Sequence, residues 1–211
     1  MNLLFDLDGT LTNPFQGITK CISYALERLG RPSPPSGELI WCIGPPLIKS
    51  FAKLLDTDDN VLAEKALGFY RERFSMVGLF ENELYEGIPE ALEALQSKGH
   101  VLYLSTAKPR VYAERIMDHF GLTRYFNALY GAELDGTRND KTSLISHILK
   151  TESIAAAEAV MIGDRKYDMI GAKENGVRGF GVLWGYGTKD ELETSGASGF
   201  IQTPQSLGTA F

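Results

Sequence analysis

The chain has 211 residues, of which 44% are hydrophobic and 23% charged, and its formal net charge is −6 at pH 7. This length suits one large α/β domain, or a core domain with a smaller domain inserted into it. The acidic balance argues against binding to nucleic-acid polymers or anionic membranes, which need a basic surface. It leaves room for a small anionic substrate, since a few local cations or a metal can serve one phosphate group.

The cysteines and the apolar segments bear on the compartment. Cys21 and Cys42 lack the spacing of a metal site or a disulfide framework, so we expect two reduced, partly buried thiols. No apolar stretch reaches the ~18–20 residues of a membrane span, and the run 1–5 is too short for a signal peptide. We therefore expect a cytoplasmic protein, a monomer or a homodimer, with no membrane partner.

The first predicted element is a buried parallel strand over 3–5, where a short apolar run ends at a carboxylate. No convincing strand follows until about residue 82. Apolar residues instead recur on one helix face in three stretches, which we place at 18–29, 47–55 and 61–74. A proline-rich loop over 31–37 separates the first two. This block predicts a small all-helical domain.

Strands and helices alternate after residue 82. The expected helices cover 89–98, 110–119, 142–150 and 169–174. The expected strands cover 101–104, 128–130, 159–162 and 179–183, the last being the final strand. Such alternation predicts a doubly wound parallel sheet. The fold class is thus α/β, with a Rossmann-like core made from 1–14 and 83–211 and an all-helical cap over 15–82.

Polar residues follow three of the predicted strands at their carboxyl ends, where open parallel sheets bind ligands. They are Asp6 and Asp8, then Ser105 and Thr106, then Asp164 with Asp168 four residues on. Lys141 starts a helix and can reach the same edge through its long stem. Side chains alternate along a strand, so we expect only one of Ser105 and Thr106 to serve, and we favour Thr106.

These residue types fit phosphoryl transfer. Carboxylates gathered in one pocket need a cation, and oxygen ligands without Cys or clustered His suit Mg²⁺. Asp6 can be a nucleophile that forms an aspartyl-phosphate. A second group, for which Asp8 is placed, must protonate the leaving alcohol and later activate water. Thr106 can donate to a phosphate oxygen, and Lys141 supplies a positive charge for Asp6 and the phosphoryl group.

Four segments resemble, in order, the four motifs of the haloacid dehalogenase superfamily. They are Asp6-Leu7-Asp8-Gly9-Thr10, Thr106 within Leu104-Ser105-Thr106-Ala107-Lys108-Pro109, Lys141, and Gly163-Asp164-Arg165-Lys166-Tyr167-Asp168. The resemblance covers essentially the whole chain, and the helical insert is similar to that superfamily's first type of cap. Segments 85–89 and 185–187 resemble the phosphoglycolate phosphatase-like branch. Segments 43–47, 78–82 and 183–187 resemble bacterial 5′-nucleotidase-like members more closely still.

The resemblance implies a Mg²⁺-dependent phosphatase that acts on a small phosphorylated metabolite, such as a nucleoside 5′-monophosphate or phosphoglycolate. In this resemblance Asp6 is the nucleophile and a metal ligand, and Asp8 is the general acid/base, whose backbone carbonyl also binds the metal. Thr106 and the backbone amide of Ala107 bind the phosphate, and Lys141 contacts both Asp6 and the phosphate. Asp164 is a metal ligand, and Asp168 supports the metal site. Ala107 departs from relatives, which often carry Ser or Asn there. The backbone amide of Ala107 can still contact the phosphate, but its methyl group cannot bind the phosphate as a Ser or Asn side chain could.

Other functions stay open at this point. A receiver domain also uses Asp, Thr and Lys, but its accepting Asp follows the third strand rather than the first. Within the superfamily, a dehalogenase would not need Asp8, a phosphonatase would need a cap lysine (Lys20, Lys49 or Lys53), and a phosphosugar mutase shares the motifs. The alternative of a different class is a catalytically silent protein that binds a phosphorylated ligand. The presence of every side chain that the chemistry needs disfavours it.

Overall fold

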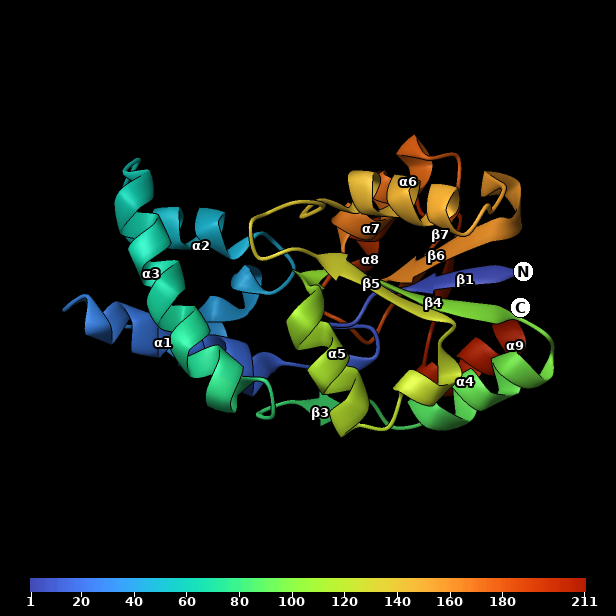
Figure 1. Cartoon of the computed structure of the whole chain (residues 1–211), viewed down its shortest axis with the longest axis horizontal. Coiled ribbons are helices and arrows are strands. Elements are labelled where there is room, and N and C mark those ends of the chain that lie inside the picture. The colour runs from blue at the N-terminus through green and yellow to red at the C-terminus, as the bar shows by residue number, and fades with distance from the viewer. The chain divides into compact units, whose positions relative to one another are not determined.

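The computed structural model describes residues 1–211, which fold into two compact units (Figure 1). The first unit comprises Met1–Asn13 and Leu84–Phe211, and the second comprises Pro14–Glu83. Sequence patterns placed these boundaries at 14/15 and 82/83. A separate two-stranded sheet pairs β2 (Thr12–Asn13) with β3 (Glu83–Leu84).

The first unit is built on a six-stranded sheet in the order β5-β4-β1-β6-β7-β8. In chain order its strands are β1 (Asn2–Phe5), β4 (Val101–Pro109), β5 (Ala128–Ala132), β6 (Ala159–Gly163), β7 (Arg178–Val182) and β8 (Gly199–Ile201). Every neighbouring pair is parallel. β1 lies inside the sheet, and its Leu3, Leu4 and Phe5 are fully buried, as its apolar run predicts.

Helices cover both faces of this sheet. They are α4 (Ile88–Ser97), α5 (Arg110–His119), α6 (Lys141–Thr151), α7 (Lys166–Glu174), α8 (Lys189–Thr194) and α9 (Leu207–Ala210), with single 3₁₀ turns at Thr123–Tyr125, Ala156–Glu158 and Pro204–Ser206. Figure 1 shows α6 and α7 on one face and α4, α5 and α9 on the other. The α6 face is packed through Leu144, Ile145 and Ile148 against Leu4 and Met161 of the strands. The predicted doubly wound α/β fold is confirmed. No helix in the structure is long and apolar enough to cross a membrane.

The second unit is helical, as expected. It contains α1 (Phe15–Arg28), a 3₁₀ helix (Ser36–Cys42), α2 (Leu47–Leu54), α3 (Asn60–Arg73) and a π-helical turn (Phe74–Gly78). The first and last helical elements of this unit, α1 and the π-helical turn, pack against each other. A Cβ added to Gly17 would lie 2.1 Å from the carbonyl oxygen of Gly78, so the two backbones approach too closely for a side chain. Glu81 accepts from Arg73 at 2.6 Å and pairs with Lys20 at 3.2 Å.

Three local expectations were wrong. The strand over 179–183 is not the last, because β8 follows it; β8 has only three residues, with Ile201 alone buried, and is too short to show a pattern. The loop expected over 31–37 ends in the 3₁₀ helix that begins at Ser36. The strand expected to end at residue 104 continues to Pro109. This last difference matters, since the continuation carries site residues.

Candidate active site

The sheet order brings the polar strand ends together. β1 lies between β4 and β6, and Phe5 is in register with Leu104 on one side and Ile162 on the other. The backbone amide of Asp6 donates to the carbonyl of Ile162 at 2.9 Å, so the pairing continues one residue past the strand. Asp6 therefore lies at the carboxyl edge of the sheet, between the segments that carry Thr106 and Asp164.

A tight loop follows Asp6 and carries Asp8. The amides of Leu11 and Thr12 both donate to the carbonyl of Leu7, at 2.9 and 3.0 Å. Gly9 has a φ of +87°, a left-handed conformation that favours glycine. A Cβ at Gly9 would also lie 2.1 Å from Oδ2 of Asp164. The glycine thus lets the loop turn and lets Asp164 approach it.

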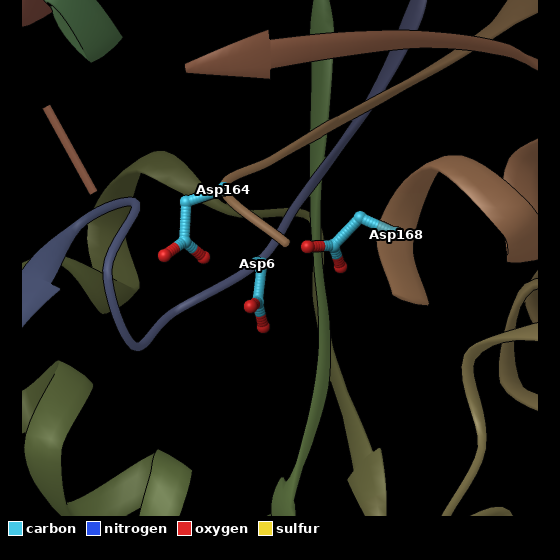
Figure 2. A group of neighbouring side chains, drawn as sticks. All are labelled: Asp6, Asp164 and Asp168. Carbon is cyan, nitrogen blue, oxygen red and sulfur yellow. The ribbon is translucent and has the colours of Figure 1, made fainter. Parts of the chain in front are cut away.

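Three carboxylates meet at this edge (Figure 2). Asp6 follows β1, Asp164 follows β6, and Asp168 lies in the first turn of α7. One oxygen of each lies within 4.8 Å of the others, and all three residues are buried. Oδ2 of Asp164 accepts from the amide of Tyr186 at 2.8 Å, while Oδ1 is buried without a hydrogen-bond partner. An oxygen-only donor set with one unsatisfied buried oxygen fits a hard divalent cation.

Lys141 is the cation that this cluster already holds. Its Nζ lies 2.8 Å from Oδ1 of Asp6 and 2.6 Å from Oδ1 of Asp168. It also donates to the carbonyl of Ser105 at 2.6 Å. The side chain is 4% exposed, so these contacts replace water almost entirely. Lys141 begins α6, and the side chain of the preceding residue, Asp140, accepts from Ser143 to cap that helix and fix its start.

Burial and mutual repulsion set the protonation of the cluster. Burial, and then the charges of Asp6 and Asp168, raise the pKa of Asp164 well above its ordinary value. Burial raises the pKa of Asp168 to about 6, against the opposing charge of Lys141. Burial alone would lower the pKa of Lys141, but the charges of Asp168 and Asp6 outweigh it and raise that pKa. Asp164 and Asp168 therefore hold protons more tightly than ordinary carboxyl groups do.

Ser105 and Thr106 are both buried near the end of β4. Oγ1 of Thr106 accepts from the amide of Lys108 at 3.2 Å, which leaves its own proton for an acceptor such as a phosphate oxygen. Oγ of Ser105 is buried without a hydrogen-bond partner, and only its backbone carbonyl contacts Lys141. Ala107 follows Thr106 on the same strand, as the sequence placed it.

Lys108 is a site residue to which sequence reasoning assigned no role. Its Nζ lies 2.7 Å from Oδ2 of Asp8, and the two side chains are 5% and 15% exposed. Burial raises the pKa of Asp8, and Lys108 opposes that shift. The available signal was a lysine two residues after Thr106 at a strand end. Its direction could not be inferred from that spacing.

The segment after β7 braces the site. Trp184 donates from Nε1 to the carbonyl of Thr10 at 3.0 Å, and the hydroxyl of Tyr186 donates to Asn13 at 2.5 Å. A Cβ at Gly185 would lie 2.3 Å from Cβ of Asp164. These contacts hold the loop after β1 against Asp164, which explains why glycines alternate with aromatic residues here.

Known proteins are similar to this chain in sequence and in fold. A family model described as haloacid dehalogenase-like hydrolase matches residues 3–182. A 5′-nucleotidase of Pseudomonas aeruginosa is 50% identical over 191 residues, which are 90% of this chain and 86% of that protein. The tyrosine-protein kinase PtkA of Mycobacterium tuberculosis is 34% identical over 90% of this chain and 65% of its own length. A crystal structure of a predicted phosphatase from Clostridium acetobutylicum superimposes with a TM-score of 0.94 and 38% identity, covering 99% of this chain and 96% of that one.

Proposed function

Because this chain belongs to the haloacid dehalogenase-like hydrolase family and is a phosphatase, we propose that it hydrolyses a nucleoside 5′-monophosphate through a phosphoryl group carried on Asp6. The observation that carries the proposal is the group of buried carboxylates around Lys141 at the carboxyl edge of the sheet. The 50% identity to a protein named 5′-nucleotidase favours the nucleotide. Phosphoglycolate is the second candidate substrate.

The proposed reaction has two half-reactions. Asp6 attacks phosphorus, the bond from phosphorus to the ester oxygen breaks, and Asp8 gives its proton to the leaving alkoxide. Asp8 then takes a proton from water, whose oxygen attacks phosphorus and releases inorganic phosphate with Asp6 restored. Lys141 holds Oδ1 of Asp6 at 2.8 Å, which leaves Oδ2 to attack. Thr106 and the amide of Ala107 hold the phosphate oxygens, and Lys141 adds charge to the same group.

The donor set suits Mg²⁺ as the cofactor. Asp6, Asp164 and the backbone carbonyl of Asp8 would hold the ion, and the unpaired Oδ1 of Asp164 is the atom that most needs it. When bound, Mg²⁺ would offset the charge of the phosphoryl group during transfer. Asp168 already contacts Lys141 at 2.6 Å, which favours a role in which it supports the metal site rather than ligating the ion directly.

Contacts of Lys20 and Lys53, two of the three lysines named above, argue against a phosphonatase. A lysine that forms a Schiff base must have its amine free to attack. Lys20 is engaged with Glu81 at 3.2 Å. Nζ of Lys53 lies 4.5 Å from the ring centroid of Trp41, in a cation–π contact. A phosphosugar mutase and a silent binding protein are left for the assay to separate.

The test is phosphate release from a panel of phosphorylated metabolites, with and without Mg²⁺. The panel holds nucleoside 5′-monophosphates, phosphoglycolate, sugar phosphates and a generic aryl phosphate. We expect phosphate release that depends on Mg²⁺, with the highest kcat/KM on a nucleotide. We also expect a phosphoryl group on Asp6 in protein that is quenched with acid during turnover. Interconversion of sugar phosphates without release would indicate the mutase. No release from any ester by folded protein with Mg²⁺ would overturn the proposal.

A further inference from the structure

The end of β4 contains a bulge that no other strand of the sheet shares. Thr106 is in register with Gly131 of β5, and the next pair is Pro109 with Ala132. Two residues, Ala107 and Lys108, are therefore extra on β4. Bulges near active sites redirect side chains that regular alternation would send elsewhere. Here the redirected side chain is that of Lys108.

Gly131 permits this bulge. A Cβ at Gly131 would lie 2.7 Å from the carbonyl oxygen of Lys108 and 2.9 Å from the backbone of Arg110. Those atoms belong to the backbone and cannot swing aside as a side chain can. The glycine on β5 and the bulge on β4 thus form one unit that fixes where Lys108 begins.

The ammonium of Lys108 is directed at one oxygen of Asp8. Nζ lies 2.7 Å from Oδ2, and both side chains are largely buried. The other oxygen, Oδ1, is buried and has no hydrogen-bond partner. Asp6 is held in a similar way, with Lys141 on its Oδ1. Asp6 and Asp8 are therefore each contacted on one oxygen by a different lysine.

We propose that Lys108 is a positioning residue, which holds Oδ2 of Asp8 so that Oδ1 is presented to the leaving oxygen of the substrate. This rests on the proposed function, in which Asp8 protonates that oxygen. In the alternative role, Lys108 binds the phosphate group of the substrate itself. The two roles of Lys108 differ in one consequence. A phosphate ligand serves every ester equally, whereas the direction of Asp8 matters only when the leaving group needs a proton.

The experiment compares an alkyl ester with an aryl ester. A nucleoside 5′-monophosphate has a poor alkoxide leaving group, whereas p-nitrophenolate leaves without protonation. The quantity measured is kcat/KM, which reports the first half-reaction alone. General acid catalysis contributes roughly 10²–10⁴-fold, so Lys108→Met is expected to lower kcat/KM for the nucleotide by at least about 10-fold more than for p-nitrophenyl phosphate. An equal loss on both esters, or no loss, would overturn the inference.

Matched variants keep the result interpretable. Lys150→Met makes the same change at an exposed position of α6 and is expected to leave both esters unaffected. Lys108→Arg keeps the charge and is expected to give a nucleotide-to-aryl ratio between wild type and Lys108→Met; a lower ratio than that of methionine counts against positioning. If Lys108→Met does not fold, Lys108→Gln takes its place under the same criterion. Absence of turnover by the wild type defeats the proposed function, whereas wild-type turnover with a uniform loss in the variant defeats only the role of Lys108.

Discussion

Asp164→Asn is expected to stabilise the metal-free protein while it removes the response to Mg²⁺. Asp164 is fully buried, and its neighbours Asp6 and Asp168 carry the same charge. The asparagine oxygen can still accept from the amide of Tyr186, as Oδ2 of Asp164 does at 2.8 Å. Its NH₂ group can donate to the remaining carboxylates. The substitution therefore keeps the shape and one hydrogen bond, and it removes a repelling charge.

The magnitude follows from the spacing. Two unit charges 4.8 Å apart, the limit for these oxygens, repel by about 3.5 kcal/mol at an effective dielectric constant of 20. The raised pKa of Asp164 relieves part of this through protonation. We therefore expect a gain of about 1–3 kcal/mol in EDTA, which raises Tm by roughly 2–12 °C for a chain of this size. Mg²⁺ at 100 times its Kd would stabilise the wild type by about 2.7 kcal/mol.

Thermal unfolding in EDTA and in Mg²⁺ tests both halves. Glu93→Gln makes the same charge change on an exposed position of α4 and is the control. Expected is a higher Tm for Asp164→Asn than for wild type in EDTA, with little further rise in Mg²⁺. A Tm at or below wild type in EDTA, together with an unchanged Mg²⁺ shift, would refute the reasoning from repulsion.

Three further predictions concern the same cluster. Asp6→Asn is expected to leave the protein folded and lower kcat by at least about 10³-fold, and a normal kcat would remove Asp6 as nucleophile. Lys141→Met leaves Asp6 and Asp168 without their shared partner; breaking a buried pair costs about 3–5 kcal/mol, measured by urea unfolding, and a loss below about 1 kcal/mol would show that water replaces the ammonium. The pKa of Asp168 is raised from 3.8 to about 6 in the metal-free folded state. Between these two pH values the folded protein keeps a proton that the unfolded chain releases, so the free energy of unfolding falls as pH rises through about 6. Mg²⁺ must displace such protons, so the rise in Tm on adding Mg²⁺ is expected to be larger at pH 7 than at pH 5; a rise that is independent of pH would contradict this.

Much of the site was predictable because the strand order determines which strand ends lie together. The sequence places a carboxylate after the first strand, a hydroxyl after the second expected core strand and a carboxylate after the strand of residues 159–162. These groups must meet if the three strands are neighbours. The observed order β4-β1-β6 makes them so. The structure thus brings Asp6, Thr106 and Asp164 to one edge, with Lys141 and Asp168 joining from α6 and α7. Their catalytic roles stay predictions.

What sequence patterns missed depends on irregular backbone. The direction of Lys108 comes from a register shift between β4 and β5, and periodicity describes regular strands only. Gly131 lies just past the strand expected over 128–130, and nothing in the pattern indicates the close approach of Lys108 and Arg110. Gly185 and Gly187 entered only through segments that resemble known relatives, whereas the structure shows that each permits close packing on Asp164. Such requirements are properties of neighbouring segments far apart in the chain.

The charges of the site, counted together, connect its stability to its cofactor. Asp6, Asp8, Asp164 and Asp168 face the ammonium groups of Lys108 and Lys141. Four carboxylates against two lysines leave two negative charges in excess when all are ionised, the amount that one divalent cation offsets. Burial, and then the like charges beside them, raise the pKa values of Asp8, Asp164 and Asp168, so without that cation these groups hold protons more readily. The same imbalance therefore destabilises the metal-free fold and creates the binding energy for Mg²⁺, so a variant that relieves the first must weaken the second.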